Sequence, residues 1–239
     1  MGKVKIKRKS TLIDMTAMSD VTVLLLTFFM LTSTFLQKEP VTVLTPSSVS
    51  EQKVPTSNVV SVLVSPQGKV FLSVLGEADP NVAGGEWGTE PIRKQILMNA
   101  VNLYNEQHPS NKIQLTDAQV DAFTKINMFG MPFQALPSFL SMSQTDQDKF
   151  LSDMNNPATG IPVNDNKDMA HLNDFQIWLR AIYNSGNENL QSVMKKGEGI
   201  AVKADKDTPY STIHDVLDNL QTMKMNRFSI MTALKTEND

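Results

Sequence analysis

The stretch IDMTAMSDVTVLLLTFFMLTSTF, residues 13–35, decides how the chain is organised. Residues 21–37 contain no charged side chain, and Asp14 and Asp20 are the only acids between residues 12 and 36. A helix of about 25 residues would extend about 37 Å, which is enough to cross a hydrocarbon core of about 30 Å. We therefore predict a transmembrane helix over residues 11–37.

Basic residues precede this helix and orient it. They give five positive charges within the first nine residues, at Lys3, Lys5, Lys7, Arg8 and Lys9. Positive charges beside a membrane helix stay on the cytoplasmic side, so residues 1–10 are predicted to form a cytoplasmic tail. A signal peptide would need small residues before its cleavage site, and the exit TSTFLQKEP has bulky ones. An uncleaved anchor therefore places residues 38–239 on the far side of the membrane.

The composition excludes several kinds of chemistry. The chain has 239 residues and no cysteine, which excludes disulfides, thiolate catalysis and Cys-ligated metal sites. Its net charge is −3, so the part after the basic tail carries −3 − 5 = −8. An acidic surface repels phosphates, so we expect no nucleic-acid partner.

Asp20 is the unusual residue of the predicted membrane helix. It would lie about 12 Å from the cytoplasmic end, where an aspartate costs about 2.5–3.5 kcal/mol of insertion free energy. Thr16, Asp20, Thr27 and Thr34 are spaced by four, seven and seven residues, so they share one face of a helix. Acids in membrane helices usually face a protein interior or a wet cavity.

Three interpretations of Asp20 remain open at this stage. The carboxyl group could be tolerated near the interface, or it could hydrogen-bond a partner helix. It could also relay protons or cations, with a pKa raised by desolvation. We favour the relay, because one acid on a threonine-lined stripe suits reversible protonation. A single aspartate forms no channel, so this interpretation requires a partner protein.

The remaining sequence predicts a linker and an α+β domain. Residues 38–58 are rich in Pro, Ser, Thr and Val and indicate an extended linker. Residues 59–239 form the predicted domain, with helices packed on one face of a small sheet. Strands are expected over residues 59–65, 69–75, 199–205 and 227–234. Helices are expected over residues 89–106, 116–129, 145–154, 168–184, 189–196 and 208–223.

Local patterns refine this prediction. Thr116 and Gln119 have the spacing of a capping box. Asp207 or Thr208 is expected to cap the helix that contains Pro209 in its first turn. Phe175 and Trp178 are expected in the core.

No pattern points to an enzyme or a metal site. The three histidines are far apart, and Asp168, His171 and Asp174 step around a helix by threes, which does not converge on a metal. The sequence contains no G-x-S-x-G, P-loop or G-x-G-x-x-G motif. We therefore expect no cofactor and no enzymatic activity. The acids Asp205 and Asp207, with Pro209 and Tyr210, are candidate partner-binding residues.

Two motifs resemble the ExbD/TolR family of biopolymer transport proteins. The family's membrane helix has an Asn or Asp, then Thr-Pro, then an Asp before an apolar run, and Asp14, Thr16 and Asp20 match it. Ala17 stands where proline is common. The segment IAVKADKDTPYSTIHDVLDNLQTMKMNRFSIMT, residues 200–232, is similar to the family's closing strand–helix–strand. Residues 109–197 resemble an insertion, because the family's domain is usually shorter.

The resemblance implies a function and partners. It implies an inner-membrane subunit that works with an ExbB-like pentamer, with Asp20 carrying protons in the pore. Its domain would be periplasmic, form a homodimer and engage a TonB-like protein that opens outer-membrane transporters. A TolR-type subunit with a TolA-like partner is an alternative. A passive membrane-anchored binding module, with Asp20 only as a contact between helices, is another.

Overall fold

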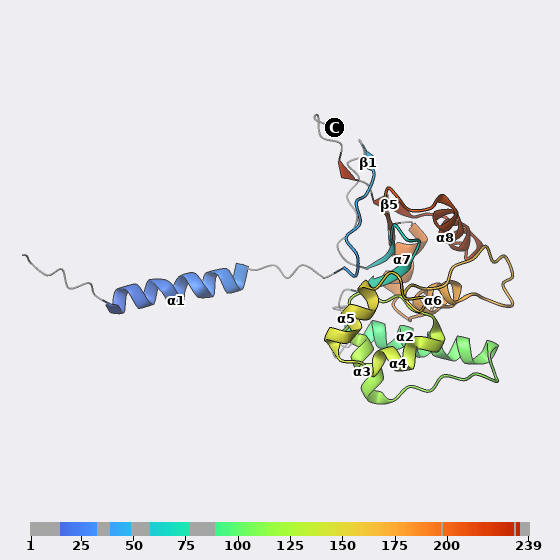
Figure 1. The fold of residues 1–239 in the computed structure, drawn as a ribbon, viewed down its shortest axis with the longest axis horizontal. Helices are drawn as coiled ribbons and strands as arrows, with labels where there is room; N and C mark the ends of the chain where they lie inside the picture. Colours follow the sequence, from blue (N-terminus) through green and yellow to red (C-terminus); the bar gives the residue numbers. More distant parts are fainter. Residues whose placement is uncertain are drawn as a thin grey trace, which may run out of the picture. The chain divides into compact units, whose positions relative to one another are not determined.

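The computed structural model describes residues 15–32, 39–48, 58–76, 89–196, 198–231 and 233–234, with side chains for all but 15–17, 47–48 and 233–234. The chain divides into two compact units, Met1–Gln37 and Lys38–Asp239 (Figure 1).

The first unit contains one helix, α1 (Met15–Thr32). Its sequence has no glycine or proline, and leucine and methionine favour helix formation because they lose little rotamer freedom in it. The rest of the predicted span, residues 11–14 and 33–37, lies outside the described residues. Within the described part of the chain, no helix meets the combined requirement of length and apolar character for a membrane span.

The second unit is an α+β domain on a small mixed sheet. Its strands are β2 (Val59–Val64), β3 (Val70–Leu75), β4 (Ile200–Ala204) and β5 (Ser229–Met231), in the order β3-β2-β4-β5. β2 and β3 are antiparallel, and the other two pairings are parallel. The β2–β3 turn ends at Gly68, whose φ of 73° explains the glycine. A separate pairing joins β1 (Ser47–Ser48) to β6 (Ala233–Leu234) in parallel.

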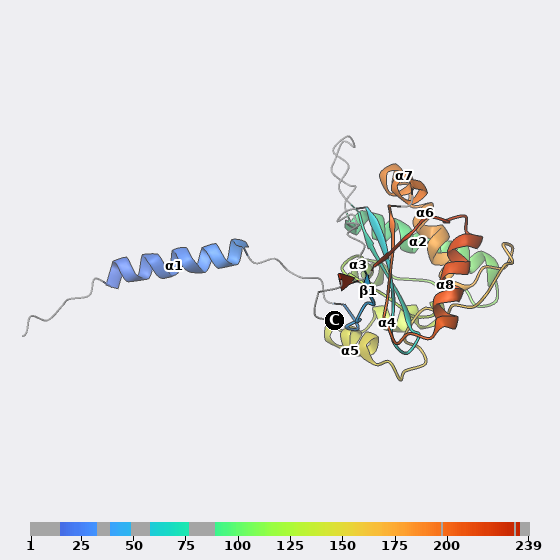
Figure 2. The same cartoon turned by 90° about the horizontal axis from the view of Figure 1, so that it is seen from above.

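Helices surround this sheet. They are α2 (Thr89–Gln107), α3 (Asp117–Thr124), the 3₁₀ turn η1 (Phe133–Ala135), α4 (Leu136–Leu140), α5 (Gln144–Ser152), α6 (Asp174–Tyr183), α7 (Glu188–Lys196) and α8 (Tyr210–Thr222). Figure 2 shows α6 and α8 on one side of the sheet. α8 connects the parallel strands β4 and β5, as a crossover requires.

An extended segment, residues 39–48, covers part of the opposite face; we call it the strap. Alternate residues of a strand face opposite sides, so Lys203 and Val202 lie on different faces of β4. The Lys203 Nζ contacts Glu39 Oε2 of the strap at 2.7 Å. Val43 of the strap is buried, at 7% exposure. The segment predicted as a linker therefore begins with residues that pack on the folded unit.

The core centres on Trp178 of α6, which is fully buried. Its ring lies 4.6 Å from that of Phe129, 4.9 Å from Phe133 and 5.8 Å from Phe123, centroid to centroid. Phe129 also forms an antiparallel bridge with Leu72, which ties the loop after α3 to the edge strand β3. Aromatic contacts at these separations add to the free energy gained from burial.

Several predictions are confirmed. The hairpin, the strand at β4, and helices α2, α5, α7 and α8 all form within two residues or so of the expected limits. Phe175 and Trp178 lie in the core. The Thr116–Gln119 capping box forms at the start of α3.

Three predictions about where helices begin or end are wrong. The helix expected over residues 168–184 begins only at Asp174, because Asn173 caps it. The helix expected over residues 116–129 ends at Thr124, and the loop that follows pairs with β3 instead. The cap predicted for α8 is also wrong: Pro209 occupies that position, and it makes no side-chain hydrogen bond. The Thr208 hydroxyl donates to the carbonyl of Ser65 instead.

Candidate functional site

The first candidate site is the polar face of α1. Asp20 is the only ionisable residue between Met15 and Thr32, and its side chain is exposed. Thr27 follows it by seven residues, which places the two about 20° apart around an ideal helix. Thr16 lies in the first turn of α1, and Thr34 lies outside the described residues.

The threonines of α1 bond to their own helix. The hydroxyl of Thr27 donates to the carbonyls of Val23 at 3.0 Å and Leu24 at 2.9 Å. Thr22 and Thr32 donate in the same way to the carbonyls four residues earlier. Their hydroxyl hydrogens are therefore satisfied without water, whereas their oxygens can still accept a hydrogen bond.

The apolar side chains of α1 are exposed on every side. Leu26, Phe29 and Leu31 are 68%, 65% and 86% exposed. A helix that is apolar all round is typical of a buried or membrane environment. In such surroundings Asp20 would be the one group of the helix that can bind and release a proton.

The second candidate site is the loop between β4 and α8. Asp205 is buried at 5% exposure, and its Oδ2 accepts a 2.7 Å hydrogen bond from the backbone N–H of Leu44 in the strap. Its Oδ1 accepts from the N–H of Asp207 at 2.9 Å. The N–H of Lys206 donates to the carbonyl of Leu44, which completes the attachment. Asp205 therefore fastens the strap to the domain.

The other candidate residues near this loop are exposed to solvent, unlike Asp205. Asp207 and Pro209 are exposed, and Tyr210 is 77% exposed at the start of α8. The ring of Tyr210 contacts His214 one turn later, at 5.9 Å between centroids. The four predicted partner-binding residues thus divide: Asp205 has an internal role, and the other three are available at the surface.

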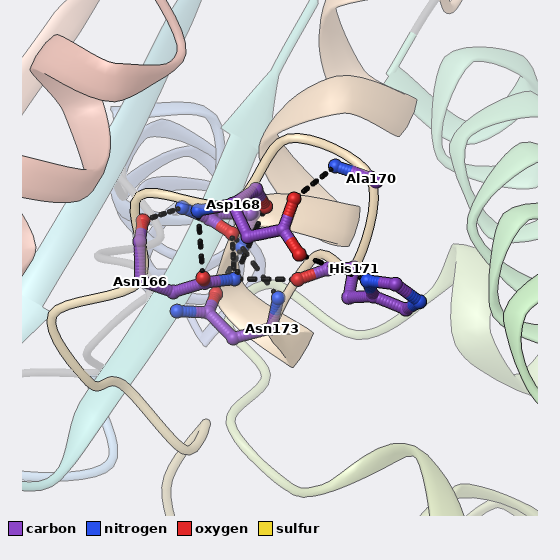
Figure 3. Close-up of polar contacts among 6 residues, drawn as sticks. Asn166, Asp168, Ala170, His171 and Asn173 are labelled. Carbon is purple, nitrogen blue, oxygen red and sulfur yellow. Dashed lines mark hydrogen bonds and ion pairs between the residues drawn. The ribbon is translucent and has the colours of Figure 1, made fainter.

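Asp168, His171 and Asp174 are not grouped around one point. Figure 3 shows His171 beside Asp168, with 2.8 Å between Nδ1 and Oδ2. Asp174 instead accepts a hydrogen bond from the N–H of Phe133, and burial raises the pKa of Asp174. Within the described residues, no three His, Cys, Asp or Glu side chains are grouped to hold a metal.

A polar network that the sequence analysis missed surrounds this turn. The Asn166 amide nitrogen donates to the carbonyl of His171 and to Gln176 Oε1 (Figure 3). Asn173 caps α6 through a capping box with Gln176, and its amide donates to Asn219 of α8. The spacing Asn173-x-x-Gln176 is visible in the sequence and could have located the start of α6.

A cavity in the folded unit has a volume of about 550 Å³. α3 and the loop after it form one wall, and α5 forms another. Glu39 and Pro40 bring the strap to its edge. The side chain of Gln147 lines it and donates to the carbonyls of Phe139 and Met142. The strap and the helices α3 and α5 therefore all contribute to the lining of this cavity.

Comparison with known families settles the assignment. The family model described as "Biopolymer transport protein ExbD/TolR" matches residues 7–127, about half of the chain. The chain belongs to the ExbD/TolR family. No curated protein and no solved structure gives a match.

The ExbD/TolR match includes some of the candidate site residues and leaves others outside. It includes α1 with Thr16, Asp20 and Thr27, and it continues through β2, β3, α2 and α3. The β4–α8 loop with Asp205 lies beyond the matched residues, as do α5, α6 and α7. Membership of the ExbD/TolR family makes the chain a biopolymer transport protein, a class that works as an accessory to transport.

Proposed function

We propose that this chain is an ExbD-type subunit of an inner-membrane motor driven by the proton-motive force. In this proposal α1 and its flanking residues span the inner membrane once, the N-terminus is cytoplasmic, and the folded unit is periplasmic. An ExbB-like pentamer surrounds α1, and a homodimer of this chain transmits motion to a TonB-like protein. The motor energises TonB-dependent transport across the outer membrane.

The observation that carries the proposal is Asp20. It is the only ionisable group of a helix whose other described side chains are apolar, small or hydroxyl-bearing. Asp20 therefore has no charged neighbour within α1, and the hydroxyls of Thr22, Thr27 and Thr32 donate to backbone carbonyls of the helix. Burial of such a carboxyl by a partner would favour its protonated form, and access to water would favour release.

The exposed apolar surface of α1 supports the membrane and partner parts of the proposal. Leu24, Leu25 and Phe28 are each more than half exposed. Burying such side chains in lipid or against a partner yields about 25 cal/mol per Å² of apolar area. The five positive charges before residue 10 support a cytoplasmic N-terminus.

One contact in the folded unit supports the proposed transmission of motion. Asp205 fastens the strap to the loop that leads to Asp207, Pro209 and Tyr210. Because the strap follows α1 in the chain, a displacement of α1 would reach the folded unit first through residues 39–48. We propose that the exposed residues Asp207, Pro209 and Tyr210 contact the periplasmic partner.

A TolR-type subunit that serves envelope integrity is the alternative within the family. It would use the same Asp20 chemistry with a TolA-like partner. Affinity purification of the full chain from its native membranes, followed by mass spectrometry, distinguishes them: recovery of a TonB-like protein supports the ExbD type, and recovery of a TolA-like protein supports the TolR type.

The decisive experiment replaces Asp20 by Asn, which preserves size and removes titration. We expect Asp20→Asn to abolish uptake of a TonB-dependent nutrient in cells that lack the native copy, and Asp20→Glu to retain part of it. Glu106→Gln, which removes one charge from the exposed surface of α2, is the control for proton carriage. Proton flux into proteoliposomes that contain the purified complex should fall in parallel with uptake, and replacing protons by sodium as the gradient ion tests the nature of the ion.

Full uptake and flux with Asp20→Asn would refute the proposal. If that variant kept its function and only weakened assembly with the pentamer, the passive binding module would be the better description. Assembly is measured by native mass spectrometry of the same preparations.

A further inference from the structure

A second, smaller cavity lies at the ends of three helices. Its volume is about 270 Å³, and its lining comes from the last turns of α6 and α7, from the residues after α8, and from Met169. These elements are far apart in the sequence, so the cavity exists only in the folded unit. No part of the proposed proton pathway or of the strap contributes to its lining.

Methionines form the apolar part of this cavity. Met194 and Met225 are buried, at 2% and 6% exposure, whereas Met169 at the rim is 41% exposed. Met223 is partly buried between them. Methionine side chains are flexible and polarisable, and they recur at surfaces that adapt to apolar side chains of a partner.

Three cations surround the methionines. Arg180, Lys195 and Lys224 line the cavity, and no Asp or Glu does so. None of the three forms an ion pair with a described residue, and Lys195 instead lies 5.6 Å from the centre of the Tyr183 ring. This concentration of positive charge is unusual in a chain whose net charge is −3.

Helix dipoles explain part of this arrangement. Arg180 and Lys195 lie in the last turns of α6 and α7, where a cation is favourable. They do not explain why these two helices direct their cations to one apolar cavity, nor why Lys224, which follows α8 with a φ of 59°, lines it as well. A concentration of cations without carboxylates favours an anionic ligand.

The wall that carries Met169 is held in place. Asp168, the residue before Met169, accepts hydrogen bonds from the backbone N–H of Ala170 and from the ring of His171, which follow Met169 in the chain (Figure 3). The Asn166 side chain closes the same turn through the carbonyl of His171. A preorganised wall reduces the entropy lost on binding.

We infer that this cavity is a docking site for an acidic peptide segment of a partner protein. One apolar side chain of the segment packs on Met169, Met194 and Met225, and flanking carboxylates pair with Arg180, Lys195 and Lys224. A cavity of about 270 Å³ is large enough to hold one apolar side chain of such a segment. The inference is independent of proton transport by Asp20.

The test uses the full chain in nanodiscs of phosphatidylcholine, which carry no net charge. The probe is a fluorescent six-residue peptide with a central Leu-Phe pair flanked by glutamates on both sides, and binding is measured by fluorescence anisotropy. We expect saturable binding that weakens as salt is raised, because the charges lie at the surface. Two matched peptides are the controls: one replaces every glutamate by lysine, and one replaces Leu-Phe by Ser-Ser.

Variants locate the binding to this cavity. Arg180→Gln and Lys195→Gln should each weaken the acidic peptide by roughly tenfold or more, the effect of losing a hydrogen bond to a charged group. Lys196→Gln is the matched control, because Lys196 is the exposed neighbour of Lys195 in α7 and does not line the cavity. Circular dichroism melting of each variant shows whether the fold is retained, and Met169→Ser tests the apolar contact without changing charge.

Four outcomes would overturn the inference. They are no binding of the acidic peptide, equal binding of the lysine peptide, equal loss with Lys196→Gln and Lys195→Gln, and displacement of the peptide by octanoate, which would indicate a small anionic amphiphile as the ligand. Loss of binding confined to Arg180→Gln, Lys195→Gln and Met169→Ser would establish it.

Discussion

Helices α1 and α6 are both rich in apolar residues, but these side chains are exposed in α1 and buried in α6. In α6, Phe175, Ile177 and Trp178 are fully buried by other elements of the same unit. In α1, Leu26 and Phe29 are about two-thirds exposed. The difference teaches that α6 obtains its free energy of burial within the chain, whereas α1 depends on surroundings that the chain does not supply.

The two helices also differ in their acids. Asp174, the first residue of α6, is held by the N–H of Phe133 and is partly buried. Asp20 in the second turn of α1 is exposed, and the hydroxyls of Thr22 and Thr27 bond to their own backbone. The fold therefore fixes Asp174, whereas the proposed function requires a partner to control Asp20.

The largest effect is expected from a substitution in the α6 core. Trp178→Ala removes a ring that packs on Phe123, Phe129 and Phe133, so the free energy of unfolding should fall by about 3–5 kcal/mol. Trp178 Nε1 has no hydrogen-bond partner among the described residues, so this loss is one of packing. Leu26→Ala in α1 should leave the unfolding of the folded unit unchanged. Differential scanning calorimetry of the full chain measures both, and an equal loss for the two would contradict the comparison.

A smaller loss of stability is expected from a substitution of Asp205, which attaches the strap to the domain. Asp205→Ala leaves the N–H groups of Leu44 and Asp207 without their acceptor, so stability should fall by roughly 1.5–3 kcal/mol. The amide of Leu44 should also exchange its hydrogen much faster, as read by hydrogen–deuterium exchange mass spectrometry. Asp207→Ala, a change at an exposed residue of the same loop, is the control. Unchanged exchange at Leu44 in the Asp205 variant would show that the strap is held by other contacts.

The smallest effect concerns the pH dependence of the acid in α6. Burial raises the pKa of Asp174 in the folded state, so the folded state binds more protons than the unfolded state between the two pKa values. Stability from this group is fully present below the unfolded pKa and is lost as pH rises through the folded pKa. We expect Asp174→Asn to flatten the fall in stability above about pH 4. Urea unfolding at several pH values measures the slope, and an unchanged slope would assign the pH dependence to other groups.

The pKa of Asp168 is shifted in the opposite direction from that of Asp174. Its hydrogen bond with His171 lowers the pKa of Asp168, so its contribution is present above the unfolded pKa and is lost as pH falls through the folded one. The two acids are six residues apart in the chain, and their pKa values move in opposite directions because one is solvated and paired while the other is desolvated.

The parts of the fold that the sequence predicted correctly are those with local causes. The hairpin was predictable because the strand residues are apolar and β-branched and the turn contains Gly68. The start of α6 was predicted wrongly because Asp168 to Leu172 look compatible with a helix and the capping-box spacing of Asn173 and Gln176 was not used. The contacts of Asn166 that hold the preceding turn could not be read from the sequence. The role of Asp205 was also not predictable, because its acceptor geometry depends on Leu44, 161 residues earlier.

By itself, the sequence determined the apolar segment with Asp20, the basic tail before it, the hairpin and the family. These features follow from composition and short-range spacing, which are complete within a few residues. Three features were decided only by the tertiary structure. Asp205 holds the strap, and the ring of Trp178 packs against three phenylalanine rings. One cavity is lined by four methionines together with Arg180, Lys195 and Lys224. Such groupings arise when distant segments pack together to bury apolar surface, and no local pattern specifies which segments will meet.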